Sequence, residues 1–284
     1  MFDGILLINK DQGWTSHDVV AKVRGILTRE KRESHEGRGF CTEMQRKKVA
    51  SSTEKRTDAY VERATQQTAA AMRSKDGTAA SLAGSQAVRC KCRVKVGHTG
   101  TLDPLATGLM IVVTGSYCKR AQEFSKLDKV YEVEMTLGST SDTGDAEGQL
   151  TKKSDQKPTE QQLQAAVEQF VGEIEQTPPA YSAVKVGGKR AYQLAREGKE
   201  VKLEPRTVSI YSITDIAYRY PVIRFTAHVS SGTYIRSLVE DIGAELGTGA
   251  YMSALKRTKV GVFDIKDAIT VTEFTSRDIL TKRL

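Results

Sequence analysis

The chain has 284 residues, of which 39% are hydrophobic, and it carries 43 Lys and Arg against 35 Asp and Glu. This length allows one large domain or two ordinary ones, and the apolar content is sufficient for a buried core, which argues against disorder of the whole chain. The longest apolar run, Leu109 to Val113, is far below the roughly 20 residues of a membrane-spanning helix, and the first residues lack a signal-peptide pattern. We therefore expect a cytoplasmic protein that does not enter a membrane.

The positive charge is concentrated in one segment of the chain. Residues 29–95 hold 16 basic and 8 acidic residues, which accounts for the whole net charge of +8. Outside this segment, basic and acidic residues are equal in number. The net charge therefore does not by itself indicate a basic nucleic-acid-binding surface on the folded part.

Residues 31–92 differ in composition from the rest of the chain. They are rich in Ser, Thr, Ala, Gln, Lys and Arg and contain few large apolar side chains, too few to offset the entropy of ordering the chain. Three of the four cysteines, Cys41, Cys90 and Cys92, lie here, but their spacing does not resemble the paired ligands of a zinc knuckle. The composition predicts a flexible basic insertion with reduced thiols and no metal.

The remaining sequence predicts a mixed domain. Apolar periodicity and turn residues indicate, in chain order, a strand over 4–9, a helix from Thr15 or Ser16 to 27, a strand over 109–114, a helix over 116–127, a half-buried strand over 131–137, helices over 159–171 and 190–197, strands near 208–218 and 222–229, and a helix over 233–246. Strands and helices do not alternate strictly. This order favours an α+β fold around a mixed sheet.

The most informative stretch runs from Gly97 to Gly108 and leads directly into the predicted buried strand at 109–114. It combines glycines, hydroxyls, His98 and one carboxylate, Asp103, and Pro104 restricts the backbone beside that carboxylate. Loops that feed rigid strands often carry reactive groups. An Asp before Pro is also a common turn former, so turn formation alone is an open alternative. No Gly-Lys-Ser/Thr follows, which disfavours a phosphate-binding Walker loop.

This stretch resembles the catalytic signature of the TruB family of tRNA pseudouridine synthases, in which a Gly-His-Thr-Gly-x-Leu-Asp-Pro-x-Ala-x-Gly run contains the essential aspartate. Further stretches that are similar to the family, in the same order, are 4–10, 13–16, 129–138, 143–148, 176–185 and 230–238. Together they cover most of residues 1–30 and 93–272.

The resemblance implies the pseudouridine synthase fold, a mixed, mainly antiparallel sheet flanked by helices. It predicts a catalytic domain from residues 1–30 and 93–272, the flexible basic insertion at 31–92, and a C-terminal tail at 273–284 without an extra RNA-binding domain. The insertion replaces a few residues in the family, and longer loops add only roughly 0.6 kcal/mol of closure cost per doubling. Asp11 also stands where the family usually has Pro.

The activity that the resemblance implies is the conversion of a uridine in RNA to pseudouridine. The expected substrate is the T-arm of tRNA, with the uridine at position 55 of the tRNA as the target, recognised through the folded loop. The target base would be flipped out of its stack into a pocket. No metal or organic cofactor, no obligate protein partner and a monomeric state are expected.

Three residues match the family's catalytic positions. Asp103 would act as nucleophile or base, Tyr131 would stack on the flipped base, and Arg236 would pair with Asp103. Taken without the resemblance, Tyr131 fits a core aromatic on an alternating strand, and Arg236 fits a surface arginine.

Substrate-binding residues are predicted on the same basis. His98 would hold the RNA loop, and Tyr234 and Leu255 would line the pocket. Three basic residues are candidates for phosphate contacts, with solvated surface charge as the alternative: Lys185, Lys256 and Arg257.

Two other functions remain open at this point. The protein could be a tRNA-folding chaperone that acts by binding alone, or a guide-dependent pseudouridine synthase that works inside a ribonucleoprotein. The presence of Asp103, Tyr131 and Arg236 together favours an enzyme. A plain nucleotide hydrolase is disfavoured because the sequence has neither a phosphate loop nor a metal-binding cluster.

Overall fold

A computed structural model of the chain describes residues 2–36, 93–199 and 201–280. The chain divides into two compact units, one formed by Met1–Arg24 and Lys95–Leu284, the other by Gly25–Val94. Most of the predicted insertion, including its three cysteines, lies outside the described residues. Within the described ranges, no helix has the length and apolar character needed to cross a membrane.

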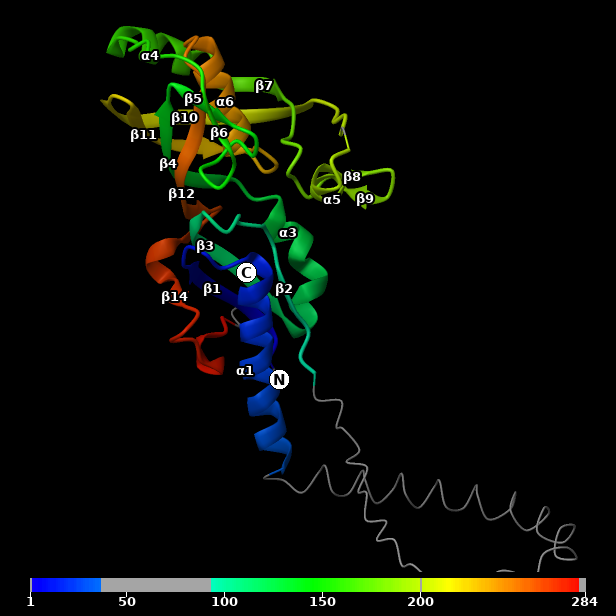
Figure 1. Cartoon of the computed structure of the whole chain (residues 1–284). Coiled ribbons are helices and arrows are strands. Elements are labelled where there is room, and N and C mark those ends of the chain that lie inside the picture. The colour runs from blue at the N-terminus through cyan, green and yellow to red at the C-terminus, as the bar shows by residue number, and fades with distance from the viewer. Residues whose placement is uncertain (1, 37–92, 200, 281–284) are drawn as a thin grey trace, which may run out of the picture. The chain divides into compact units, whose positions relative to one another are not determined.

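The larger unit is built on a ten-stranded, mainly antiparallel sheet (Figure 1). Its main path runs in the order β14-β1-β3-β12-β4-β11-β10-β7, with β2 pairing β3 and β13 pairing β12. Only β1·β14 and β3·β12 pair in parallel among the described strands of this sheet. The strands are β1 Gly4–Lys10, β2 Val96–His98, β3 Thr107–Thr114, β4 Lys129–Leu137, β7 Gly172–Gln176, β10 Arg206–Arg219, β11 Val222–Val229, β12 Ala250–Val260, β13 Phe263–Asp264 and β14 Ile269–Thr270.

Helices and two small hairpins complete the described structure. The helices are α1 Ser16–Glu36, α3 Ala121–Ser125, α4 Glu160–Glu168, α5 Ala191–Arg196 and α6 Ile235–Glu245, with 3-10 turns at Gly115–Arg120, Ile265–Asp267 and Ser276–Asp278. The hairpins pair β5 Ser139–Ser141 with β6 Leu150–Lys152, and β8 Lys185–Val186 with β9 Lys189–Arg190. The predicted α+β fold with a mainly antiparallel sheet and flanking helices is confirmed.

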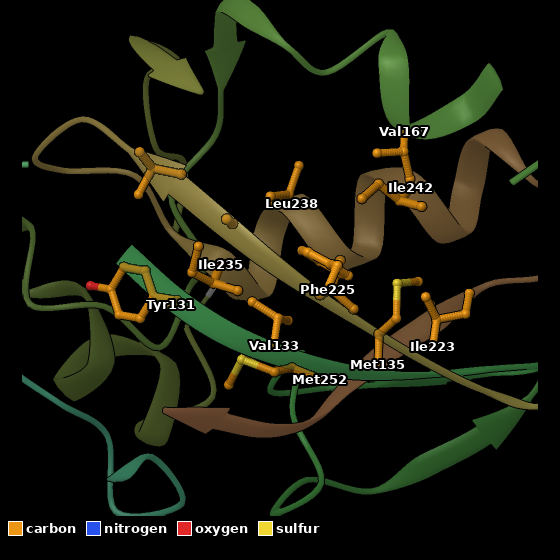
Figure 2. Packing of buried hydrophobic residues seen from close by; sticks show 14 of the residues in the cluster. Tyr131, Val133, Met135, Val167, Ile223, Phe225, Ile235, Leu238, Ile242 and Met252 are labelled. Atoms are coloured by element: carbon orange, nitrogen blue, oxygen red, sulfur yellow. The ribbon is translucent and has the colours of Figure 1, made fainter. Parts of the chain in front are cut away.

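The main core lies between the central strands and α6 (Figure 2). On β4, Tyr131, Val133, Met135 and Leu137 are buried while Glu132 is exposed, because alternate residues of a strand face opposite sides. Apolar residues of β11, β12 and α6 pack against this face. The alternation that predicted a half-buried strand is therefore the pattern that builds the core.

Hydrogen bonds identify the residue that caps the start of each of two predicted helices. Thr15 caps α1, because its Oγ1 accepts from the Asp18 N–H at 3.1 Å and the Asp18 carboxylate accepts from the Thr15 N–H at 3.0 Å. Thr159 caps α4 in the same reciprocal way with Gln162. Ser16 is thereby free for a different contact, described below.

Two predicted helices differ from the structure, and one central strand was not predicted. The helix α1 continues to Glu36 rather than ending at residue 27. The helix expected over 116–127 is a 3-10 turn, Gly115–Arg120, followed by the short helix α3. The eleven-residue strand β12, at the centre of the sheet, was not predicted. Its pairing with β4 shifts register between Met252 and Ala254 and again between Arg257 and Lys259. Each irregularity breaks the two-residue alternation on which strand prediction depends.

The close approach of β3 and β12 requires glycine at position 108. Gly108 has φ of +104°, and a Cβ there would lie 2.3 Å from the backbone oxygen of Arg257. We expect Gly108→Ala to lower the free energy of unfolding by about 3 kcal/mol, from left-handed strain together with overpacking. The matched control is Gly172→Ala, with φ of +114° and nothing within 4 Å, for which strain alone predicts about 1 kcal/mol. Urea denaturation measures both, and equal losses would contradict the packing explanation.

Candidate active site

The loop that carries Asp103 is held on both sides by the N-terminal segment. The Ser16 hydroxyl donates to the Leu102 carbonyl and accepts from the Leu102 N–H, both at 2.9 Å. The Gly13 N–H donates to the Pro104 carbonyl at 2.9 Å. Because the residues before and after Asp103 are anchored to the same segment, the position of the Asp103 backbone is fixed by the fold.

A buried lysine adds a third anchor that the sequence analysis did not single out. Lys10, at the end of β1, is fully buried, and its ammonium donates to the carbonyls of Trp14 at 2.7 Å, Asp11 at 3.0 Å and Pro104 at 3.4 Å. Burial lowers the pKa of Lys10 to about 8, while the negative charge of Asp103 acts in the opposite direction. The exchange of the family's Pro for Asp11 leaves this contact in place, because the backbone carbonyl accepts the bond.

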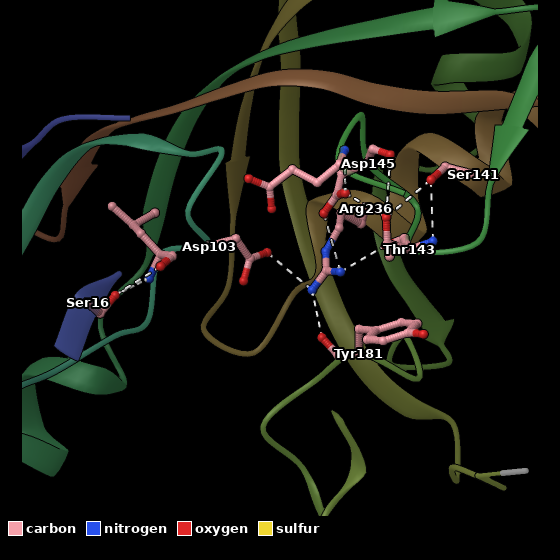
Figure 3. Close-up of polar contacts among 9 residues, drawn as sticks. Ser16, Asp103, Ser141, Thr143, Asp145, Tyr181 and Arg236 are labelled. Atoms are coloured by element: carbon pink, nitrogen blue, oxygen red, sulfur yellow. Dashed lines mark hydrogen bonds and ion pairs between the residues drawn. The ribbon is translucent and has the colours of Figure 1, made fainter. Parts of the chain in front are cut away.

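Asp103 and Arg236 form an ion pair between elements that are distant in the sequence (Figure 3). The Asp103 Oδ2 lies 3.1 Å from the Arg236 Nη2, and the two side chains are 36% and 7% exposed. Arg236 comes from the first turn of α6, where a cation is unfavourable for the helix dipole. Its position is therefore explained by the carboxylate that it faces.

The Arg236 guanidinium is fixed by three further partners. Nη1 donates to the Thr143 carbonyl at 2.9 Å, Nη2 donates to the Tyr181 carbonyl at 2.9 Å, and the Asp145 Oδ2 lies 3.6 Å from Nη1. Together with the Asp103 pair, these contacts join three separate loops around one side chain (Figure 3). The guanidinium plane thus has little freedom to turn away from Asp103.

Asp145 is a site residue that the sequence analysis missed. It is 3% exposed, and its Oδ1 accepts from the Thr143 hydroxyl at 2.6 Å and from the Glu147 N–H at 3.1 Å. The available signal was the Thr143–Gly148 run, which was noted only as part of the resemblance. A short Thr-Gly-Asp turn indicates a loop but gives no sign that its carboxylate is buried against an arginine.

The surroundings of Asp103 disfavour the ionised form of its carboxyl group. Burial raises the pKa of Asp103 above its ordinary value of 3.8, the Arg236 guanidinium lowers it, and the nearby Asp145 raises it. The net direction is upward. The ionised form of Asp103 is therefore less stable than that of an aspartate in water. This favours reaction of the carboxylate with an electrophile or a proton.

A cleft of about 330 Å³ opens above this ion pair. Its lining brings together six of the predicted site residues: Asp103, Tyr131, Tyr234, Arg236, Leu255 and Arg257. Tyr131 is 7% exposed and belongs to the main core as well as to this lining, and its stacking on a flipped base stays a prediction. The Tyr234 backbone is held by the buried Gln176 amide, which donates to its carbonyl at 3.1 Å and accepts from its N–H at 2.7 Å.

Three predicted substrate-binding residues lie outside this lining. Lys185 is exposed in the β8–β9 hairpin, and Lys256 pairs with Glu132 at 3.2 Å on the other face of the sheet. His98, in β2, packs edge-on against His17 with ring centroids 5.7 Å apart, and its Nδ1 has no hydrogen-bond partner in the described part of the chain. Burial, and to a smaller extent His17, lower the pKa of His98.

The structure rules out one alternative for Arg257. A solvated surface charge was one of the two expected states, but Arg257 is 2% exposed. Its Nε donates to the Leu109 carbonyl at 2.7 Å and its Nη2 donates to the Gly100 carbonyl at 3.2 Å. The reason is the central position of β12, which carries Arg257 under the loop that precedes β3.

Comparison with known proteins agrees with this arrangement. Residues 86–235 match the model of the TruB family pseudouridylate synthase N-terminal domain, and residues 236–282 match the tRNA pseudouridylate synthase B C-terminal domain. A solved Cbf5-Nop10-Gar1 complex contains a chain that superposes with a TM-score of 0.56 at 25% identity, covering 95% of this chain and 53% of that one. A second, an H/ACA RNP bound to a substrate RNA containing 2'-deoxyuridine, has a TM-score of 0.55 at 22% identity, over 96% and 52% of the two chains, and supports the fold.

Two relatives are similar to this chain in sequence and carry the same name. The chain is 44% identical over 178 residues to tRNA pseudouridine synthase B of Syntrophotalea carbinolica and 45% identical over 177 residues to that of Burkholderia mallei. These matches cover 62% of this chain and 58% and 59% of the two relatives, so the chain spans less than two-thirds of their length. The fold is that of the pseudouridine synthases. The chain belongs to the TruB family within that class.

Proposed function

We propose that this protein isomerises a uridine of tRNA to pseudouridine, with the T-loop uridine at position 55 of the tRNA as the target. The observation that carries the proposal is the fixed pair of Asp103 and Arg236 in a cleft lined by three tyrosines. Family membership and the relatives named tRNA pseudouridine synthase B support this choice of reaction and substrate.

The reaction breaks the bond between ribose C1' and uracil N1 and forms a bond between C1' and C5. Asp103 assists as nucleophile or base, and Arg236 holds its carboxylate in place throughout. The C5 proton is lost to water and N1 gains a proton, so the step is redox-neutral. The target base must leave its stack to reach Asp103, and Tyr131 offers a ring on which it stacks in the cleft.

Tritium release provides the direct test. A tRNA transcript made with C5-tritiated uridine should lose one tritium to water for each pseudouridine formed, and mapping should place the new pseudouridine in the T-loop. Purified protein acting on free tRNA would exclude the need for a guide RNA. A folded protein that binds tRNA but releases no tritium would overturn the proposal in favour of a chaperone that acts by binding alone.

The pH dependence of the rate follows from the state of Asp103. Only the carboxylate form can act, and its pKa is raised in the folded protein, so the rate falls as the pH decreases through that raised value. We expect the acid limb of kcat/KM to lie above pH 3.8, the ordinary pKa of an aspartate. An acid limb at or below that value would contradict the assignment.

The matching control is the exposed Asp155, which pairs with Lys152 at 2.7 Å. Asp155→Asn should leave the acid limb unchanged.

The contribution of Asp103 to stability changes with pH in the opposite direction to its contribution to activity. Because its folded pKa exceeds its unfolded pKa, its protonation on lowering the pH favours the folded state. Loss of activity on the acid limb is therefore not explained by unfolding through Asp103.

Several properties stay predictions. They are cytoplasmic localisation, a monomeric state, independence from protein partners, and the boundaries of the catalytic domain, insertion and tail. The structural similarity to H/ACA chains covers about half of those chains, and what they assemble with is a property of those proteins. Activity of the purified chain on free tRNA tests the independence from partners, and sedimentation tests the oligomeric state.

A further inference from the structure

Two buried cations line one end of the catalytic cleft. Lys129 and Arg257 are 8% and 2% exposed, and both belong to the lining that contains Asp103. On β4, Lys129 and Tyr131 lie on the same face, two residues apart, and Arg257 of β12 pairs directly opposite Tyr131. The register of two neighbouring strands therefore places both basic residues next to Tyr131, and all three line the cleft.

Neither cation has a carboxylate partner within ion-pair distance among residues 2–36, 93–199 and 201–280. Arg236, the other buried arginine of the cleft, contrasts with them because it faces both Asp103 and Asp145. A buried charge without a counter-ion is costly and persists only where other interactions compensate for it. This end of the cleft thus carries uncompensated positive charge.

Within the described ranges, both side chains keep donors that backbone carbonyls do not use. The Lys129 ammonium donates to the carbonyls of Ser125, at 2.7 Å, and Leu127, and one of its three N–H groups remains. Arg257 uses two of five N–H groups, on Leu109 and Gly100. The carbonyls fix both heads and leave donors for a ligand.

The charge of Lys129 survives at neutral pH. Burial lowers the pKa of Lys129 to about 8, Arg257 lowers it as well, and Asp128 raises it. Lys129 therefore remains mainly protonated at pH 7 while its neighbour Arg257 is always charged. A site with this charge selects an anion.

We propose that Lys129 and Arg257 form a subsite for one phosphodiester of the RNA backbone, adjacent to the nucleotide whose base enters the cleft beside Tyr131. The inference rests on the proposed RNA substrate. A phosphodiester supplies the missing negative charge and accepts the free N–H groups, and it accompanies any nucleotide that reaches Asp103. The subsite fixes the position of the ribose relative to the carboxylate.

Binding of a T-arm stem-loop RNA, measured over a range of KCl concentrations, tests the subsite without relying on turnover. Lys129→Met should weaken binding about tenfold at low salt and reduce the slope of log affinity against log salt by about 1, since one phosphate contact is lost. The matched control is Lys152→Met, which removes an exposed lysine paired with Asp155 and should leave the slope unchanged. Lys129→Arg, which keeps the charge, should retain the wild-type slope if it folds.

Neutral methylphosphonate links at the phosphates flanking the target uridine locate the contact. On the RNA whose contacted phosphate is neutral, Lys129→Met should cause no further loss of affinity. An unchanged salt slope with a lower melting temperature, or the same loss on every RNA, would overturn the subsite and leave Lys129 as a structural cap of α3. If wild type binds RNA but releases no tritium, the proposed function fails while this binding result stands. If wild type binds no RNA, both fail.

Discussion

Asp103→Asn should reduce tritium release by at least about 10³-fold while the protein remains folded and still binds tRNA. Asparagine has nearly the same shape as aspartate but can neither attack the ribose nor accept a proton in this role. The surrounding contacts should persist, because Arg236 retains Asp145 and the carbonyls of Thr143 and Tyr181. Single-turnover tritium release together with tRNA binding measures the separation of chemistry from affinity.

Asp155→Asn is the matched control for this change. It makes the same chemical substitution at a side chain that is 82% exposed, and its activity should equal that of wild type. If Asp103→Asn retained activity within about tenfold of wild type, the reacting carboxylate would have to lie elsewhere. Loss of tRNA binding in parallel with activity would instead indicate that Asp103 mainly orders the loop.

Arg236→Met should have the second largest effect, on stability as well as on activity. The change removes the cation from a pair in which the side chains of Arg236 and Asp145 are 7% and 5% exposed, and it leaves a buried carboxylate without its partner. We expect the free energy of unfolding to fall by about 3 kcal/mol, the range found when one member of a buried pair is removed. Activity should fall as well, because Asp103 loses the group that orients it.

A control variant and a double variant test whether the lost ion pair causes this effect. Arg224→Met removes an arginine that is 71% exposed and pairs with Glu134 at 2.7 Å, and should cost no more than about 0.5 kcal/mol. Adding Asp145→Asn to Arg236→Met should restore part of the lost stability, because the unpaired charge is removed. Urea denaturation of wild type, Arg236→Met, Asp145→Asn and the double variant gives the coupling energy. Additive losses, with no rescue in the double variant, would contradict the ion-pair explanation.

Local patterns in the sequence were sufficient for much of the fold. The alternation over Tyr131–Leu137 predicted β4 and its buried face, and Thr159 was predicted as the start of the helix α4. These features depend on neighbours in the chain, which the sequence displays directly. Strand β12 was missed because its two register shifts interrupt the alternation, and they arise from pairing with β4 rather than from local preference.

For the site, the sequence by itself determined which chemical groups are present: one aspartate in a constrained loop, a tyrosine on a strand and an arginine after a glycine turn. The resemblance predicted that Arg236 pairs with Asp103, and only the tertiary structure decided which other groups meet this pair. The contact of Arg236 with Asp103 and Asp145, and the burial of Lys10 and Arg257, arise from separate loops and strands brought together by the sheet. Charge and exposure at such positions are properties of the packed surroundings, and no local sequence pattern encodes them.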